Sequence, residues 1–373
     1  MQFLAGFFQD TNQMVDKKKV LVAMSGGVDS SVAAGLLKEA GYDCTGVFMC
    51  FGQPDRKSQS HRACCSPDDA RDAKDVAQQL GIKFAVLDFK QDLEKIIDYF
   101  VTEYKEARTP NPCIICNSML KFGKLLEYAS ALDADYVATG HYAQVVNANG
   151  QMRLARGIDK NKDQSYALFN IPRQNLSRIL LPLGSYTKQQ VRQLAAKMNL
   201  SVRDKPESQE ICFIGDNNYA RLVAERAPEV CRPGDVVDSQ GRKLGDHTGI
   251  YQYTIGQRRG LGIAAGEPRY VIRLDKETNT VVLGTRAELM KKRLVAVKIN
   301  WLVEPSPVEP FHSVIQIRYN HRGAAGIVTP ADASGEVTVD FDEPVSAITP
   351  GQAAVFYDMD KNVIGGGWID RVT

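Results

Sequence analysis

The stretch VLVAMSGGVDSS, which runs from Val20 to Ser31, decides the fold of the N-terminal half of this 373-residue chain. It joins a short apolar run, Val20–Met24, to a glycine pair and then to sequence typical of a helix that stops before Gly41. The glycines let the backbone approach a ligand closely, and consecutive amides and the helix N-terminus attract anions. The stretch therefore predicts a strand, a loop and a helix that together bind the phosphates of a nucleotide.

The side chains of this loop support the same interpretation. Ser25, Ser30 and Ser31 offer hydroxyl donors, and Asp29 offers a carboxylate for a magnesium ion that would neutralise phosphate charge. No lysine follows the glycines as in a Walker A loop, and the spacing differs from the dinucleotide fingerprint. A plain glycine turn with a serine cap is the alternative, but the strand-loop-helix context favours nucleotide binding.

Apolar runs of strand length recur after this loop and alternate with helical stretches. The runs are Val20–Met24, Thr45–Met49, Phe84–Phe89 and Tyr136–Thr139. Such alternation predicts an α/β fold, with a parallel sheet covered by helices. Ligands of these sheets bind beyond the carboxyl ends of the strands, so the loops after the four runs should meet at the site.

The second half of the chain has a different residue pattern. Glycine-rich and β-branched segments with turn pairs such as Pro350-Gly351 predict all-β structure after Pro228, and a third domain should start near residue 292. Before it, one helix is expected from its N-cap Thr187 to Lys197. We interpret the basic residues of this helix as a solvated face.

The composition of the chain indicates its protein class and its cellular compartment. A hydrophobic content of 44% indicates globular domains, and no apolar run reaches the roughly 20 residues that span a bilayer. The net charge of +2 gives no overall attraction to nucleic acid, so a surface for RNA would have to be local. Eight scattered cysteines fit a reducing compartment. We therefore expect a cytoplasmic protein that has no membrane partner. A monomer is the expected state, although no feature of the sequence determines it.

Three of the cysteines lie in sequence contexts that indicate a chemical role. Cys113 and Cys116 are one helical turn apart and directly follow the proline-stiffened segment TPNP. A helix that begins near Cys113 would lower the pKa of these thiols through its free amides and its dipole. Cys212 follows a polar stretch that we expect to be a mobile loop. Low-pKa thiols are nucleophiles and metal ligands, whereas the plainer interpretation of Cys212 is a buried core residue.

At the glycine loop the chain resembles the PP-loop ATP pyrophosphatases, which adenylate an oxygen and release pyrophosphate. Further segments, in chain order, are similar to the pattern of the bacterial tRNA-specific 2-thiouridylases: TPNPxxxCNxxxKF, GHYAQ, KDQSYALF, SQEICFIG, YTIGQRRGLG and PGQAAVFY. The resemblance implies a PP-loop domain of the adenine nucleotide α-hydrolase type at 18–215, a small central β-rich domain at 216–291 and a C-terminal β-barrel at 292–373. Residues 1–17 form an N-terminal extension with no assigned role.

The resemblance also implies a reaction, the 2-thiolation of the wobble uridine of tRNA. ATP with Mg²⁺ would adenylate the base O2 and release pyrophosphate. Cys212 would carry sulfur as a persulfide to C2, and Cys116 would be the nucleophile that closes a disulfide with Cys212. The sulfur would come from a donor such as a cysteine desulfurase or a sulfur relay protein.

Matching motifs assign the remaining site residues. Cations suit phosphates, and aromatic rings can stack on unpaired bases. The residues expected to contact ATP are Ala23, Met24, Ser25, Gly26, Gly27, Val28, Asp29, Ser30, Met49 and Gly140. Those expected at the target base are Asn111, Pro112 and Cys113. Those expected to contact tRNA, chiefly its anticodon stem-loop, are His141, Lys162, Asp163, Gln164, Arg318, Tyr319 and Gln352.

Cys113 departs from the family pattern, in which many members have an aspartate that is proposed to assist proton transfer. The change leaves Cys113, Cys116 and Cys212, a set that resembles the three ligands of a [4Fe–4S] cluster in other tRNA thiolases of the superfamily. A cluster-dependent route and a cluster-free persulfide route therefore both stay open. A structural zinc on the same thiols is a weaker alternative, because it would block the nucleophile.

Two other kinds of function compete with sulfur transfer. A PP-loop synthetase or amidotransferase would adenylate a small-molecule acceptor, but it would not need Cys116 or Cys212. A tRNA-binding module with a relic nucleotide site would carry a damaged loop, whereas SGGVDSS is intact. The other cysteines are assigned no catalytic role: Cys44, Cys50, Cys64, Cys65 and Cys231.

Overall fold

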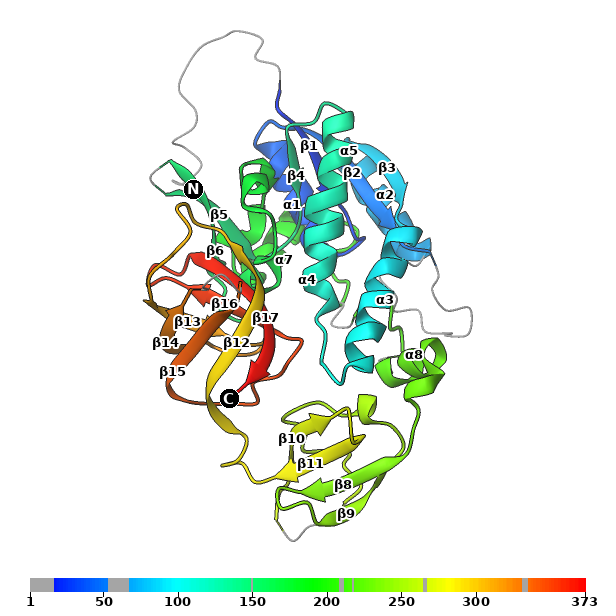
Figure 1. The fold of residues 1–373 in the computed structure, drawn as a ribbon. Helices are drawn as coiled ribbons and strands as arrows, with labels where there is room; N and C mark the ends of the chain where they lie inside the picture. The colour runs from blue at the N-terminus through cyan, green and yellow to red at the C-terminus, as the bar shows by residue number, and fades with distance from the viewer. Residues whose placement is uncertain are drawn as a thin grey trace.

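The computed structural model describes residues 17–52, 67–148, 150–207, 211–216, 218–263, 267–330 and 335–373. The expectations for the N-terminal extension and for Cys64 and Cys65 lie outside these residues. Three regions follow one another along the chain: a helix-covered sheet, a small sheet and a barrel (Figure 1). No helix in the described ranges has the length and apolar character needed to cross a membrane.

A five-stranded parallel sheet forms the centre of the first region, with the strand order β3-β2-β1-β4-β7. Its strands are β1 (Lys19–Ala23), β2 (Asp43–Cys50), β3 (Lys83–Asp88), β4 (Tyr136–Ala138) and β7 (Ile179–Leu180). The four runs predicted as strands are confirmed as β1 to β4. Strand β7 is two residues long, too short to produce a periodic pattern in the sequence.

Helices cover both faces of this sheet, and the side chains of β1 alternate between the two faces. Val20 and Val22 belong to one apolar core with residues of α1, α2 and α7, whereas Leu21 belongs to another with residues of α3, α4 and α5. The helical segments of this region are α1 (Val28–Glu39), α2 (Pro67–Leu80), α3 (Lys90–Lys105), α4 (Pro112–Cys116), η2 (Asn117–Lys124), α5 (Leu125–Ala131), α6 (Ser165–Leu168), η3 (Arg173–Arg178), η4 (Pro182–Ser185) and α7 (Lys188–Lys197). The predicted cap of α7 is confirmed, since Thr187 and Gln190 form a capping box.

The helix that carries Cys113 and Cys116 changes its winding part-way. It begins as α4, continues as the π-helix η2 and ends as α5. A side chain at Gly123 would place its Cβ 2.8 Å from the carbonyl oxygen of Ser118, so the wide turn requires glycine there. Such π segments are uncommon and often mark functional sites.

The second region is a small sheet with the strand order β10-β11-β8-β9. It contains β8 (Gly234–Asp238), β9 (Lys243–His247), β10 (Tyr270–Asp275) and β11 (Thr280–Gly284), together with the short turns η5 (Pro228–Val230) and η6 (Ile250–Gln252). The helix α8 (Tyr219–Arg226) precedes it and was not expected from the sequence. Tyr219 of α8 stacks on Tyr104 of α3, which ties this region to the first one.

The third region is the predicted barrel, which closes in the order β12-β15-β14-β13-β16-β17. Its strands are β12 (Met290–Trp301), β13 (Phe311–Gln316), β14 (Ala324–Thr329), β15 (Val337–Ser346), β16 (Ala353–Tyr357) and β17 (Val363–Val372). Ala354 and Phe356 of β16 point into the barrel core, whereas Val355 and Tyr357 pack into the core of the first region. One strand thereby fixes the barrel against the sheet domain.

A hairpin of β5 (Ala143–Ala148) and β6 (Gln151–Arg156) strengthens this junction. Ala155 of the hairpin pairs with Asn362 of the barrel. The guanidinium of Arg156 lies 3.7 Å from the ring centroid of Tyr357. Side chains near this junction can therefore come from both regions.

Candidate active site

The glycine loop is closed by its own serines. The backbone amide of Ser25 donates to Oγ of Ser30 at 3.1 Å. The hydroxyls of Ser30 and Ser31 both donate to the carbonyl oxygen of Gly27, at 3.2 and 2.8 Å. The loop is thus pre-formed at the carboxyl end of β1, with α1 beginning at Val28.

Two of the glycines predicted to contact ATP lie where no side chain fits. Gly26 has a φ of +71°, and a Cβ there would lie 2.3 Å from the carbonyl oxygen of Asp69. A Cβ at Gly140 would lie 2.7 Å from the backbone nitrogen of Ser30. The loop after β4 therefore packs directly on the loop after β1, as the sheet topology predicts.

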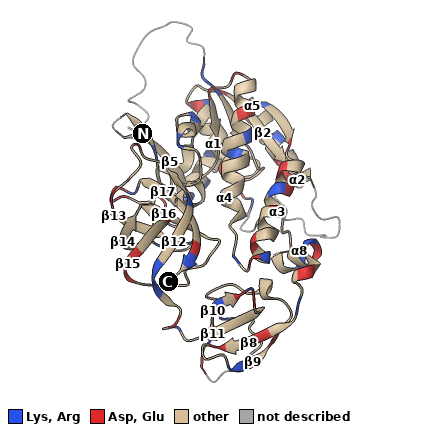
Figure 2. Ribbon diagram, viewed as in Figure 1, with Lys and Arg blue, Asp and Glu red and all other residues tan. Residues whose placement is uncertain are grey.

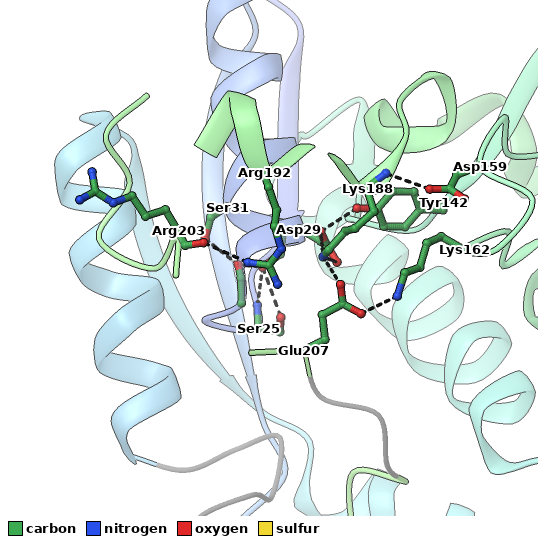
Figure 3. Close-up of polar contacts among 12 residues, drawn as sticks. Ser25, Asp29, Ser31, Tyr142, Asp159, Lys162, Lys188, Arg192, Arg203 and Glu207 are labelled. Carbon is green, nitrogen blue, oxygen red and sulfur yellow. Dashed lines mark hydrogen bonds and ion pairs between the residues drawn. The ribbon is translucent and has the colours of Figure 1, made fainter. Parts of the chain in front are cut away.

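Asp29, predicted as a magnesium ligand, lies in a network that the sequence did not reveal (Figure 3). Its Oδ1 accepts a hydrogen bond from the hydroxyl of Tyr142 at 2.8 Å. The ammonium of Lys188 donates to both carboxylate oxygens, at 2.7 and 2.9 Å. Burial and then the negative charge of Asp29 raise the pKa of Tyr142, so this phenol stays a hydrogen-bond donor.

Glu207 extends this network towards the segment that carries Cys212. It accepts from Lys162 at 2.6 Å and lies 2.9 Å from Lys188. Burial opposes its ionisation, but the hydrogen bonds from Lys162 and Lys188 outweigh burial and lower its pKa to about 2. The solvated face that we expected for α7 is wrong for Lys188, because its side chain is 13% exposed and points to the loop.

The barrel holds the segment that precedes Cys113. The backbone amide of Thr109 donates to the carbonyl oxygen of Pro350 at 2.9 Å. The side-chain amide of Gln352 donates to the carbonyl oxygen of Thr109 at 2.9 Å and reaches that of Pro110 at 3.3 Å. The segment expected at the target base is therefore fixed from outside its own domain.

The cysteines differ in their surroundings. Cys116 and Cys212 are both half-buried and pack against the same apolar core, next to Ile115 and Ile211. Cys113 is exposed, yet surrounding protein and then the neighbouring Cys116 raise the pKa of its thiol. The helix N-terminus was expected to lower this pKa, whereas burial and the neighbouring Cys116 act in the opposite direction.

The metal interpretations of these cysteines find no structural support. Across the part of the chain that the structure describes, no three His, Cys, Asp or Glu side chains form a group that could hold a metal ion. Cys113, Cys116 and Cys212 therefore do not form a metal-binding group in this structure. Asp29 is the carboxylate at the loop that would hold a magnesium ion together with the phosphates of a nucleotide, and in this structure Lys188 occupies both of its oxygens.

Comparison with known proteins identifies the family. The tRNA-specific 2-thiouridylase MnmA of Carboxydothermus hydrogenoformans is 49% identical over 363 residues, which cover 96% of this chain and 99% of that protein. This chain belongs to the tRNA-specific 2-thiouridylase family. The MnmA of Halothermothrix orenii is 48% identical, with 94% of this chain and 98% of that protein covered. That of Rhodopirellula baltica is 44% identical, with 94% and 96% covered.

Three domain families match successive parts of this chain. They are the tRNA methyl transferase HUP domain over residues 18–216, the tRNA methyl transferase PRC-barrel domain over 222–285 and the aminomethyltransferase beta-barrel domain over 291–369. The HUP match implies that the first region binds ATP, in agreement with the glycine loop. The three matches follow the order of the sheet domain, the small sheet and the barrel.

The residues that the 2-thiouridylase pattern assigns to tRNA are unequally accessible. Tyr319 is 44% exposed, and burial raises its pKa, with smaller effects from the nearby Lys162 and Cys113. The guanidinium of Arg318 donates to the carbonyl oxygens of Ser346 and Ala347, at 3.0 and 3.3 Å.

Other residues of this set have hydrogen-bond partners within the protein. His141 is 8% exposed, its Nδ1 lies 2.7 Å from Oγ1 of Thr139, and burial lowers its pKa well below the usual value. Asp163 accepts from Arg156 at 2.9 Å, and Gln164 accepts from the amide of Tyr142 at 2.9 Å. Basic and acidic residues alternate along the described part of the ribbon without one sign prevailing in any region (Figure 2), as the net charge of +2 leads one to expect.

Proposed function

We propose that this protein converts the wobble uridine of tRNA to 2-thiouridine and uses ATP to activate the base. The observation that carries the proposal is the 49% identity, over nearly the full length of both chains, to a protein named as a tRNA-specific 2-thiouridylase. The intact glycine loop and the two half-buried cysteines on one core support it.

The first step activates the uridine. Its O2 attacks the α-phosphorus of ATP, the bond to the β-phosphate oxygen breaks, the N3 proton is lost and pyrophosphate leaves. An oxygen that is a poor leaving group becomes part of AMP. We assign ATP to residues 23–30, Met49 and Gly140. A magnesium ion on Asp29, once bound, would neutralise phosphate charge.

The second step transfers sulfur. The terminal sulfur of a persulfide on Cys212 attacks C2, and AMP leaves with the former O2. The thiolate of Cys116 then attacks the inner sulfur of Cys212, which breaks the sulfur–sulfur bond and releases 2-thiouridine. Two electrons pass from the thiols to the transferred sulfur, so Cys116 and Cys212 end as a disulfide that a cellular reductant must reduce.

Partners and domain limits belong to the same proposal. The sulfur reaches Cys212 from a cysteine desulfurase or a relay protein, and the tRNA lies across the junction, on Tyr319, Lys162 and the segment Asn111–Cys113. The domains extend over residues 18–215, 216–291 and 292–373. We derive no step through an iron–sulfur cluster, because the described cysteines do not form a group that could hold one.

Pyrophosphate release tests the proposal and separates it from the alternatives. We expect release from ATP only when unmodified tRNA is present, and 2-thiouridine in the digested tRNA when a persulfide donor is added. A small-molecule synthetase would release pyrophosphate without any response to tRNA. A protein that binds tRNA but releases none, even after reduction of its cysteines, would contradict the proposed reaction.

A further inference from the structure

The nucleotide loop has no lysine of its own, yet an ammonium group faces it. Lys188 belongs to α7, and its Nζ lies 2.7 and 2.9 Å from the two oxygens of Asp29 (Figure 3). The two residues are 159 positions apart in the chain. In a P-loop, by contrast, the lysine that contacts the nucleotide phosphates belongs to the loop itself.

The fold fixes Lys188 in this place. It is the first residue of α7, directly after the N-cap Thr187. Its backbone amide donates to Oδ2 of Asp159 at 2.9 Å. Val191 and Ala195 of the same helix are buried in a core that includes Val32 and Ala33 of α1. The lysine is therefore held against the helix that begins at the nucleotide loop.

The charges around Lys188 allow it to change partners. Its ammonium faces two carboxylates, those of Asp29 and Glu207, at 2.7 and 2.9 Å. Glu207 also has Lys162 at 2.6 Å, so it stays paired if Lys188 turns away. Asp29 keeps a hydrogen bond from Tyr142 at 2.8 Å. No carboxylate of this network would be left without a partner, which removes the main cost of moving a buried cation.

We propose that Lys188 binds the polyphosphate of the nucleotide and that its departure from Asp29 opens this carboxylate to a divalent cation. The inference rests on the proposed use of ATP and names a residue and an exchange that the family motifs do not assign. Both oxygens of Asp29 accept from Lys188, so cation binding there competes with the lysine. Phosphate oxygens on the loop offer the ammonium a more highly charged partner.

Equilibrium binding to the full-length protein tests this inference. The probes are α,β-methylene ATP, which resists cleavage between the α and β phosphates, AMP, and Mn²⁺ without nucleotide. The variants are Lys188→Met and, as a second neutral substitution, Lys188→Gln. The matched control is Lys197→Met, an exposed lysine in the last turn of the same helix. Thermal unfolding verifies that each variant is folded.

We expect both Lys188 variants to bind the triphosphate analogue about 10- to 100-fold more weakly, the range of a lost charge-assisted hydrogen bond. Their affinity for AMP should change less than about 2-fold, because the contact is to the outer phosphates. Their affinity for Mn²⁺ alone should rise at least about 3-fold, since the competing ammonium is gone. Lys197→Met should match the unmodified protein in all three measurements.

The outcomes separate this inference from the proposed function. Unchanged affinity for the analogue in the Lys188 variants would overturn the inference and leave ATP use intact. An equal loss for AMP and the analogue would also overturn it, because the lysine would then only maintain the shape of the site. Failure of the unmodified protein to bind the analogue would contradict the proposed use of ATP itself, and this inference with it.

Discussion

The side-chain amide of Gln352, in the barrel, donates to the carbonyl oxygen of Thr109, in the segment that leads to Cys113, at 2.9 Å. Gly351 lies so close to Thr109 that a Cβ would be 2.9 Å from its nitrogen and its oxygen. The barrel and the sheet domain also share one apolar core. The barrel is therefore a positioning element for the segment at which we place the target base, in addition to any contact that it makes with tRNA.

Replacement of Gln352 should impair the reaction more than the fold. In Gln352→Leu the carbonyl of Thr109 loses its donor, so we expect the free energy of unfolding to fall by about 1 kcal/mol. A less fixed segment should slow single-turnover thiolation about 10-fold, while the affinity for α,β-methylene ATP stays the same. Gln193→Leu, on the exposed face of α7, is the control. An unchanged thiolation rate would show that the barrel does not position the segment.

Serine substitutions of the two half-buried cysteines should separate activation from sulfur transfer. Cys116→Ser and Cys212→Ser should lower 2-thiouridine formation at least about 100-fold, because each removes a sulfur that the transfer requires. Both should keep tRNA-dependent release of pyrophosphate, since adenylation precedes their role. Cys231→Ser, at an exposed thiol, is the control. Thiolation by Cys116→Ser at the normal rate would exclude the disulfide-forming step.

Local features of the site could be predicted from the sequence. Some elements depend mainly on residues that are close in the sequence, so the sequence pattern predicts them. They are the glycine loop, the first four strands and the capped helix at Thr187. The all-β character of the second half was predictable for the same reason, from its glycine-rich and β-branched segments and turn pairs, whereas the closed barrel was expected from the family resemblance. Strand β7 and helix α8 were missed, because each is short and is stabilised chiefly by contacts with distant elements.

Long-range contacts could not be predicted. In the sequence Lys188 is one basic residue on an amphipathic helix, and only the packing of α7 on α1 places its ammonium on Asp29. The surroundings of Cys113 are a second example. The helix α4 begins beside this thiol as predicted, but the protein packed around the thiol, which raises its pKa, could not be predicted from the sequence.

The raised pKa of Cys113 predicts slow alkylation at neutral pH. A raised thiol pKa means less thiolate at any given pH, so iodoacetamide should modify Cys113 more slowly than exposed Cys231 near pH 7.5. The rate at Cys113 should keep rising with pH beyond about 8.5, the usual thiol pKa. Peptide mass spectrometry would measure both sites in one sample. Faster modification of Cys113 than of Cys231 at pH 7.5 would mean that the helix dipole prevails after all.

The lowered pKa of Glu207 predicts a stability difference that depends on pH. The carboxyl titrates at about 2 in the folded protein against 4.5 as its ordinary value, so between these values the unfolded chain binds more protons. Its contribution is fully present above 4.5 and is lost as the pH falls towards 2. Glu207→Gln should therefore be less stable than the unmodified protein near pH 6, and the gap should shrink near pH 3.5.

Urea unfolding at the two pH values measures this gap. Because water screens the partly exposed pair, we expect the gap to shrink by about 1 kcal/mol or less, and by less still in high salt. Glu127→Gln, at an exposed position of α5, should show no such difference between the two pH values. An equal gap at pH 6 and pH 3.5 for Glu207→Gln would mean that Lys162 and Lys188 do not stabilise the ionised carboxylate. The exchange proposed for Lys188 would then lose the second cation, Lys162, that keeps Glu207 paired.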